Sequence, residues 1–273
     1  MGVAMSDARF VEFDGVGLTY GKGDTRTQAL QPTSLTVPKG EFLALVGPSG
    51  CGKSTILKLV AELLEPTEGH ILFAGRELGA EPVRVGMAFQ SASLLPWMTI
   101  RENVMLPLKI VPPFKAHFRA RKGTEFRDRA DALLERVGLI DFADKNPWQL
   151  SGGMMQRANL CRALIHDPDL LLLDEPFGAL DQFTREELWQ TVQDLWLDRA
   201  STVLLVTHDL REAAYLASRI CVMSPRPGRI IEDRVVDFAR PRPIELTFDP
   251  AFSALVQELR GLIVYTPVKG TAA

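Results

Sequence analysis

The alternation of strand-like and helix-like segments predicts an α/β fold for this chain of 273 residues. Apolar runs of strand length are separated by segments with helical spacing, an order typical of a mostly parallel sheet covered by helices. The apolar runs lie at 170–174, 203–207 and 220–223, and the helical segments between them at 184–198 and 210–217. A further observation is the helical pattern from about residue 91 to residue 165, which predicts an α-helical subdomain inserted into the sheet.

The remaining elements lie toward the two ends of the chain. Residues 9–46 alternate in short β-like runs, which predict an antiparallel β part at the N-terminus, and residues 54–65 have helical spacing. The segments ILFAGREL and VRVGMAF add strands. Near the C-terminus, Asp249 before Pro250 is a helix N-cap signal, and the apolar residues that follow share one helical face. We expect that face to pack on the domain.

The segment GPSGCGKST at 47–55 has the spacing of a phosphate-binding loop. It lies between FLALV, a run of strand length, and TILKLVAELL, which has helical spacing, and this is the context that the motif requires. Its glycines let backbone N–H groups turn toward an anion, and the following helix adds its positive N-terminal dipole. The nucleotide-binding residues expected here are Gly47, Pro48, Ser49, Gly50, Cys51, Gly52, Lys53, Ser54 and Thr55. Lys53 reaches the β- and γ-phosphates and the Ser54 hydroxyl ligates Mg²⁺, so the motif predicts a P-loop NTPase core.

The segment LLLLDEP at 170–176 predicts the second half of a phosphate site. Four leucines indicate a strand buried on both faces, and the strand delivers Asp174 and Glu175 to its carboxyl end, where open α/β sheets bind ligands. Asp174 is expected to hold Mg²⁺, and Glu175 to polarise the water that attacks the γ-phosphate. Acidic residues after a strand are common, so the prediction depends on the phosphate loop that accompanies them.

The segment LSGGMMQR at 150–157 resembles the marker of a known family, the ATP-binding subunits of ABC transporters. The resemblance implies that Ser151, Gly152 and Gly153 open a helix whose N-terminus faces the γ-phosphate bound by a second copy of the chain. A Ser N-cap followed by two glycines suits this role because it leaves bare N–H donors at the helix start. The position after the second glycine, often Gln in the family, is Met154 here.

The resemblance extends over almost the whole chain and implies a domain organisation. An ABC ATP-binding domain is expected at 1–240, with its helical subdomain at about 91–165, and a C-terminal extension with one helix at 241–273.

The same resemblance gives roles to single residues outside these motifs. Gln90, at the end of VGMAFQ, is implied to contact Mg²⁺ or the attacking water, and His208, after TVLLVT, to contact the γ-phosphate. Asp181 is the charged end of the loop GALD, which in the family crosses the interface between two copies. Tyr20 resembles the aromatic residue that stacks on adenine, and an ordinary strand tyrosine is the alternative.

Membership of this family implies an ATPase with ATP and Mg²⁺ as cofactors. Two copies are expected to close head to tail around two ATP molecules and to pull on a separate membrane permease, while a substrate-binding protein delivers the cargo. The segments LLPWMT, FGALDQFTREEL and SPRPGRI resemble the ATPases of nitrate, sulfonate and taurine importers. We therefore expect uptake of a small anion, although phosphonate-like, aromatic-acid or vitamin-precursor cargo remains open because the subunit never touches the cargo.

Two other functions are alternatives to import. One is an ABC ATPase for lipid trafficking, and the other is a soluble ABC switch acting in DNA repair or on ribosomes. The chain has one cassette and no sustained heptad stretch, which disfavours the soluble switch. Its net charge of −3 gives no basic footprint for nucleic acid.

The resemblance implies a peripheral subunit at the cytoplasmic face of a membrane, and the composition of the chain is compatible with this expectation. Its three cysteines are scattered, which does not indicate a disulfide framework and suits a reducing compartment. No apolar stretch approaches the roughly 20 residues that span a bilayer. The apolar cluster at Leu94–Trp97 predicts either a core segment or, as in the family, part of the groove that receives a permease helix.

Overall fold

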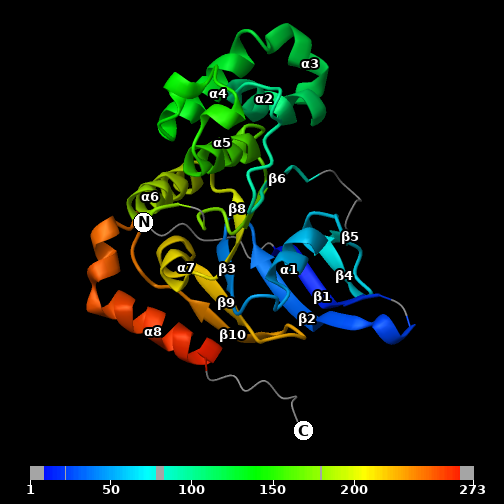
Figure 1. The fold of residues 1–273 in the computed structure, drawn as a ribbon. Coiled ribbons are helices and arrows are strands. Elements are labelled where there is room, and N and C mark those ends of the chain that lie inside the picture. The colour runs from blue at the N-terminus through cyan, green and yellow to red at the C-terminus, as the bar shows by residue number, and fades with distance from the viewer. Residues whose placement is uncertain (1–8, 22, 78–82, 179, 265–273) are drawn as a thin grey trace. The chain divides into compact units, whose positions relative to one another are not determined.

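The computed structural model describes residues 9–21, 23–77, 83–178 and 180–264. The chain divides into two compact units, one formed by residues 1–82 together with 202–273 and the other by residues 83–201. Both units contain strands and helices (Figure 1).

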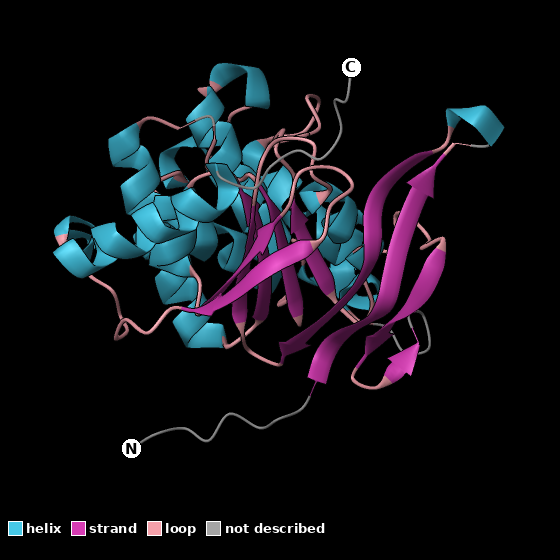
Figure 2. Ribbon diagram, turned by 90° about the horizontal axis from the view of Figure 1, so that it is seen from below, coloured by secondary structure: helices cyan, strands magenta, loops and turns pink. Residues whose placement is uncertain are grey.

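The first unit contains an antiparallel sheet with the strand order β2-β1-β4-β5. Its strands are β1 (Arg9–Tyr20), β2 (Thr27–Pro38), β4 (Glu68–Phe73) and β5 (Arg76–Glu77). Strands are drawn as magenta arrows in Figure 2. The expected antiparallel N-terminal part is confirmed, but the short runs are in fact two strands of 12 residues each. Irregular pairing between Phe13 and Val16 gives this long ribbon the bulges that allow it to bend and twist.

The first unit also contains the parallel strands that lead to the phosphate loop. Their order is β10-β9-β3-β8, with β3 (Phe42–Val46) parallel to both β8 (Thr202–Thr207) and β9 (Arg219–Met223) and with β10 (Ile230–Val235) antiparallel at the edge. Every residue of β3 and β8 is buried, as expected for parallel strands covered on both faces. The helices of this unit are α1 (Lys53–Val60), α7 (Leu210–Leu216) and α8 (Pro250–Val264).

Helix α1 is shorter than the sequence predicts, because it ends at Val60 and not at residue 65. Glu62 adopts a left-handed conformation with a φ of 57°, and Leu63 N donates back to the Lys58 carbonyl at 2.8 Å. Pro66 follows and disfavours a helical conformation at the residue before it. The apolar pattern of the sequence therefore continues for five residues beyond Val60, where the helix itself ends.

Helix α8 agrees with the prediction for the C-terminal extension. Its start is capped by Asp249, whose Oδ1 accepts a hydrogen bond from Ala251 N at 2.7 Å. Phe252 and Leu259 are buried, and the helix packs against α7 and β9. The apolar face of α8 therefore lies on the domain.

The second unit pairs two parallel strands, β6 (Val85–Ala88) and β7 (Leu170–Asp174), and is otherwise helical. Its helices are α2 (Ile100–Ile110), α3 (Phe114–Arg121), α4 (Glu125–Arg136), α5 (Gly152–Leu164) and α6 (Gln182–Arg199). Helices α2 to α5 fall within the stretch predicted to be helical. Strand β7 has the predicted bounds, and all five of its residues are buried.

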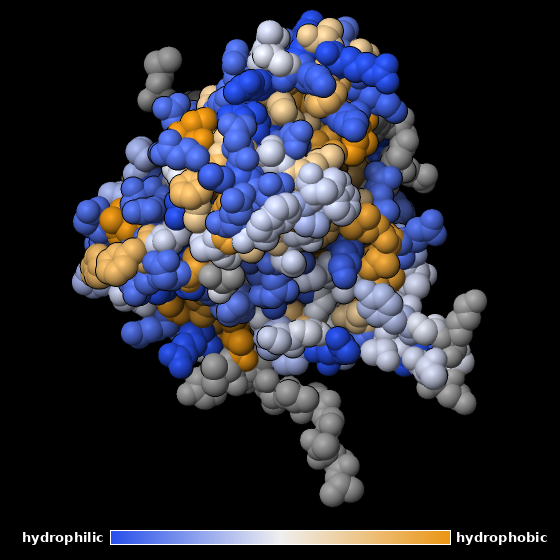
Figure 3. All heavy atoms as spheres, turned by 45° about the horizontal axis from the view of Figure 1, so that its top comes forward, coloured by the Kyte–Doolittle hydropathy of each residue, from blue (hydrophilic) through white to orange (hydrophobic). Residues whose placement is uncertain are grey.

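Several large hydrophobic side chains are exposed on these units. On the face drawn in Figure 3, hydrophobic residues lie in small separate groups among hydrophilic ones. The most exposed include Trp97, Trp148, Phe183 and Phe248. Among the described residues, no helix combines the length and the apolar character needed to cross a membrane.

Candidate functional site

The phosphate loop, residues 47–52, connects the buried strand β3 to α1. Gly52 has a φ of 105°, in the left-handed region that residues with a side chain rarely adopt. A Cβ atom at this position would lie 3.0 Å from the Ala29 carbonyl oxygen. Glycine thus allows α1 to begin directly at Lys53, where its first N–H groups lack helical partners and can bind an anion.

The Lys53 side chain folds back over this loop. Its Nζ donates hydrogen bonds to the carbonyl oxygens of Gly47 at 2.8 Å and Pro48 at 3.0 Å, and the residue is only 5% exposed. Cys51 Sγ lies 3.9 Å from the same ammonium group. Burial raises the pKa of the Cys51 thiol, and the Lys53 charge offsets only part of this effect. The loop therefore contains a buried cation beside a neutral thiol, an environment suited to neutralising phosphate charge.

The segment Ser224–Ile230 also supports the phosphate loop, which sequence reasoning missed. Arg226 Nε donates to the Gly50 carbonyl oxygen at 3.1 Å, and Gly228 N donates to the Ala29 carbonyl at 3.0 Å. A Cβ atom at Gly228 would overlap the Cys51 carbonyl oxygen. The signal in the sequence is SPRPGRI itself, which indicates a branch of the family and does not predict support for the loop.

Tyr20 lies at the end of β1, next to the helix that follows the phosphate loop. Its hydroxyl is 3.5 Å from Thr55 Oγ1, and 42% of the residue is exposed. The structure therefore brings Tyr20 beside the predicted nucleotide-binding residues and leaves part of the residue accessible. Its stacking on adenine stays a prediction.

His208 follows β8 and shares an open pocket with the phosphate loop. The pocket has a volume of about 540 Å³ and is lined by Gly47, Pro48, Ser49, His208, Asp209, Leu210, Arg211, Val256, Arg260 and Ile263. Asp209 Oδ1 accepts hydrogen bonds from Arg211 N and Glu212 N and so caps α7 directly after His208. The first unit therefore places His208 near the loop, as predicted, and adds a wall from α8 that the sequence did not indicate.

Glu175 and Gln90 meet in the second unit. Gln90 Nε2 donates to Glu175 Oε2 at 3.0 Å. Glu175 has a φ of 46°, a left-handed conformation that costs a residue with a side chain on the order of 1–2 kcal/mol. Strained backbone of this kind is often retained at functional sites, so the conformation is consistent with a chemical role for Glu175. The hydrogen bond brings together two residues that were predicted from separate motifs.

Ser151 and Asp181 are both helix N-caps in the second unit. Ser151 Oγ accepts a hydrogen bond from Met154 N at 3.3 Å at the start of α5, whose first residues are Gly152 and Gly153. Asp181 Oδ1 accepts from Thr184 N at 3.1 Å at the start of α6, and this bond lowers the pKa of the carboxyl group. Ser151 to Gly153 thus form the N-terminus of a helix of 13 residues, which is the predicted anion-binding geometry.

The predicted magnesium ligands are distributed over both units. Ser54 lies in the first turn of α1, whereas Gln90 follows β6 and the buried Asp174 ends β7. Within the described ranges, no group of three or more His, Cys, Asp or Glu side chains could hold a metal ion. A hydroxyl, an amide and one carboxylate are hard oxygen donors that suit Mg²⁺, which usually takes phosphate oxygens and waters as its other ligands. The residues fit this ion, and the site stays a prediction.

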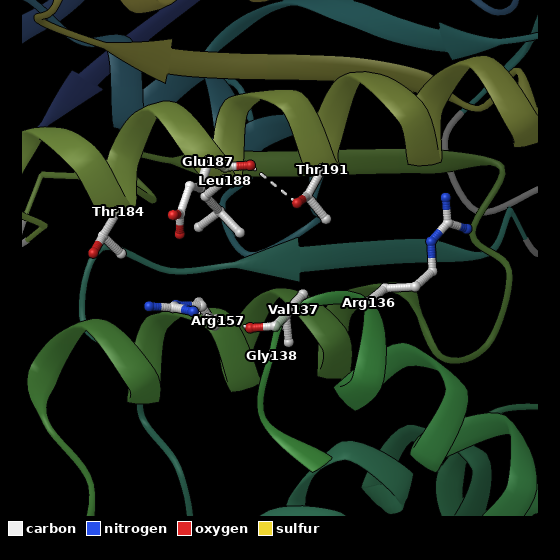
Figure 4. A pocket seen from close by; sticks show the side chains of 8 residues that line it. All are labelled: Arg136, Val137, Gly138, Arg157, Thr184, Glu187, Leu188 and Thr191. Atoms are coloured by element: carbon white, nitrogen blue, oxygen red, sulfur yellow. Dashed lines mark hydrogen bonds between the residues drawn. The ribbon is translucent and has the colours of Figure 1, made fainter. Parts of the chain in front are cut away.

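A small pocket of about 150 Å³ lies close to the marker segment in the second unit. Figure 4 shows Arg157 of α5 directed toward the turn that follows α4, while Glu187, Leu188 and Thr191 come from α6. Arg157 Nη1 donates to the Val137 carbonyl oxygen at 3.1 Å. None of the lining residues is a predicted site residue, so Arg157 serves here to hold a turn.

Comparison with protein families and curated proteins agrees with this arrangement. A family model described as "ABC transporter" matches residues 30–178. The aliphatic sulfonates import ATP-binding protein SsuB of Bacillus licheniformis is 42% identical over 240 residues, which cover 88% of this chain and 89% of that protein. The taurine import ATP-binding protein TauB of Jannaschia sp. is 41% identical over 240 residues, covering 86% and 87% respectively.

Solved structures of ATP-binding cassettes are similar to this chain. A dimeric structure of a post-hydrolysis state of the ATP-binding cassette MJ0796 bound to ADP and Pi is 31% identical in sequence, with a TM-score of 0.71. The match covers 84% of this chain and all of that one. A second dimeric structure of MJ0796, described as a bacterial ABC transporter cassette, matches equally well.

Proposed function

This chain belongs to the ABC transporter family, and from this premise we propose that it hydrolyses ATP to drive uptake of an organic sulfonate such as taurine. The observation that carries the proposal is the match, over most of both chains, to ATP-binding proteins named for sulfonate and taurine import. These relatives favour import over lipid trafficking and over a soluble mechanical switch. The chain would work at the cytoplasmic face of the membrane with a separate permease, and a binding protein would deliver the cargo.

The first unit supplies most of the proposed ATP contacts. The N–H groups at the start of α1 and the Lys53 ammonium bind the phosphates, and Tyr20 stacks on the adenine ring. Lys53 leaves the carbonyl oxygens of Gly47 and Pro48 when a phosphate oxygen replaces them as its partner. His208 contacts the γ-phosphate from the pocket that it shares with the loop.

The second unit supplies the proposed hydrolytic residues. Glu175 accepts a hydrogen bond from the attacking water and polarises it, and Gln90 orients the Glu175 carboxylate through their hydrogen bond. Ser54, Gln90 and Asp174 would hold Mg²⁺, which neutralises charge on the phosphate oxygens. From a second copy, the N-terminus of α5 at Ser151, Gly152 and Gly153 would face the γ-phosphate, with Asp181 crossing the interface.

The test is ATP hydrolysis by the complete transporter, reconstituted with its permease in liposomes. Binding proteins loaded with taurine, an alkanesulfonate or nitrate are added one at a time, and phosphate release is measured. Stimulation by a sulfonate-loaded binding protein supports the proposal. If only the nitrate-loaded binding protein stimulates hydrolysis, the cargo is nitrate and not a sulfonate. A complex that hydrolyses no ATP with any of the three binding proteins would overturn the proposed function.

A further inference from the structure

A ladder of polar side chains runs along one face of α5, at the helical positions i, i+3 and i+6. Its members are Gln156, Asn159 and Arg162, and we call this set of residues the α5 ladder. Gln156 is 5% exposed and Asn159 is completely buried. Residues at this spacing lie above one another on a helix, so their side chains can contact both each other and one neighbouring segment.

The α5 ladder holds the backbone that follows β6. Gln156 Nε2 donates to the Gln90 carbonyl oxygen in a short hydrogen bond, and Asn159 Nδ2 donates to the Phe89 carbonyl at 3.1 Å. The Arg162 guanidinium donates to the carbonyl oxygens of Ala92 at 2.9 Å and Ser93 at 3.0 Å. Four carbonyl oxygens within five residues are therefore fixed by three side chains of one helix.

The members of the α5 ladder also hold each other. Asn159 Nδ2 donates to Gln156 Oε1 at 3.3 Å, and Arg162 Nη2 donates to Asn159 Oδ1 at 2.8 Å. Both amides can adopt only this orientation, because the carbonyl oxygens that they contact accept hydrogen bonds and cannot donate them. A buried network in which each member is satisfied is rigid, and removal of one member leaves buried polar groups without partners.

The α5 ladder connects two parts of the proposed site. Ser151 caps the start of α5, where the helix would face the γ-phosphate of a second copy. Gln156, five residues later, holds the backbone of Gln90, whose side chain in turn donates to the Glu175 carboxylate. A shift of α5 would therefore move the Gln90 backbone, and with it the amide that orients Glu175.

We propose that Gln156, Asn159 and Arg162 are positioning residues for hydrolysis. They couple the position of α5 to the Gln90 backbone and so determine how the Gln90 amide contacts Glu175. This inference rests on the proposed function, in which Glu175 polarises the attacking water. The α5 ladder differs from the phosphate-binding residues, because none of its members needs to contact the nucleotide. Loss of the ladder is therefore expected to slow turnover without weakening ATP binding.

Gln156→Leu is the first variant, because leucine has a similar volume but cannot donate to the Gln90 carbonyl. We expect kcat to fall roughly tenfold, as follows from one unsatisfied buried hydrogen bond, while KM for ATP stays within about twofold. In a Gln90→Ala background the same substitution should cause no further loss. Gln190→Leu, an equal change at an exposed position on α6, is the control and should leave both constants unchanged.

Arg162 provides a second series in case Gln156→Leu does not fold. Arg162→Lys keeps one charged donor for two carbonyls and should lose less turnover than Arg162→Met. An unchanged kcat in both Gln156→Leu and Arg162→Met would overturn the inference. So would an equal loss of kcat from Gln156→Leu in the wild-type and in the Gln90→Ala background. If Glu175→Gln itself kept full turnover, the proposed role of Glu175 would fail first, and the two failures are thus distinguishable.

Discussion

Gly228 lies against the backbone of the phosphate loop, although it is far from that loop in the sequence. Its N–H donates to the Ala29 carbonyl and its own carbonyl accepts from Gln31 N, which fixes its position on both sides. A side chain at this position would overlap the Cys51 carbonyl oxygen. The loop must therefore move if Gly228 is replaced.

Gly228→Ala is expected to weaken ATP binding and to lower the free energy of unfolding by roughly 1–3 kcal/mol, as overpacking does. Gly123→Ala is a matched control, since a Cβ atom there would meet no other atom within 4 Å. Nucleotide titration and urea unfolding of the two variants measure both effects. Wild-type affinity and stability in Gly228→Ala would show that the loop tolerates the added methyl group.

His166 is a buried titratable residue, only 3% exposed, whose Nε2 lies 3.1 Å from the Val85 carbonyl oxygen. Because a carbonyl oxygen can only accept, the contact assigns a proton to Nε2. Burial lowers the pKa of His166 below its usual 6.5, and the positive charges of Arg84 and Arg129 add to this effect. The unfolded chain therefore binds a proton at a higher pH than the folded chain does.

Full stability is accordingly expected above about pH 6.5, with a decrease in the free energy of unfolding as the pH falls from there toward the folded pKa. His166→Gln keeps a donor for Val85 but cannot titrate, so its urea unfolding should depend less on pH between 7.5 and 5.5. His117→Gln, at an exposed position on α3, serves as the control. Equal pH dependence in His166→Gln and the wild type would contradict the assignment.

At the scale of elements, the sequence predicted those segments whose pattern is local. The four leucines of β7 gave its bounds, and the Asp249–Pro250 signal gave the start of α8. The predicted end of α1 was wrong because the apolar pattern continues past Val60, whereas the turn there depends on backbone hydrogen bonds. The support of the loop by Gly228 and Arg226 was missed, because no local pattern encodes contacts between distant segments.

The candidate site was predicted in a similar way. Motif spacing named Lys53, Glu175 and Ser151. In the structure Lys53 donates to carbonyl oxygens of the phosphate loop, Glu175 accepts from Gln90 and Ser151 caps α5, while their roles toward ATP stay predictions. Gln156 was not singled out, although it lies within the marker segment. Its importance depends on which carbonyl it contacts across 66 positions of the sequence, and only the folded structure gives that contact.

The segment between β6 and α2 is the element expected to meet the permease. Trp97 is 72% exposed, so it is not the core residue that was the alternative interpretation. Exposed aromatic residues are favoured anchors in protein interfaces. We therefore expect this tryptophan to insert into the contact with the permease.

Trp97→Ala should change the free energy of unfolding by less than about 0.5 kcal/mol, because the side chain is exposed. Assembly with the permease should weaken by on the order of 2 kcal/mol, or about thirtyfold, as for a central interface residue. Phe248→Ala, at a similarly exposed position outside this segment, is the control for both measurements. Normal assembly and normal cargo stimulation in Trp97→Ala would place the docking groove elsewhere.

At the scale of the whole molecule, the predicted site is divided between the two units of the chain. Tyr20, the phosphate loop and His208 belong to the first unit, whereas Gln90, Glu175 and the N-terminus of α5 belong to the second. The α5 ladder and the Gln90–Glu175 hydrogen bond join the residues of the second unit into one network. A complete site needs a second copy of the chain, because we assign the start of α5 to the nucleotide bound by the partner.

The most direct test of this central claim is the mass of Glu175→Gln in solution, measured by light scattering with and without MgATP. The amide keeps the shape of the carboxylate but does not polarise water, so turnover should fall at least about 100-fold while ATP still binds. The account predicts that MgATP converts the 30.2-kDa chain into a species of twice that mass, whereas Glu187→Gln, an exposed control, hydrolyses ATP normally. A Glu175→Gln variant that keeps the wild-type rate, or that binds MgATP without any increase in mass, would contradict it.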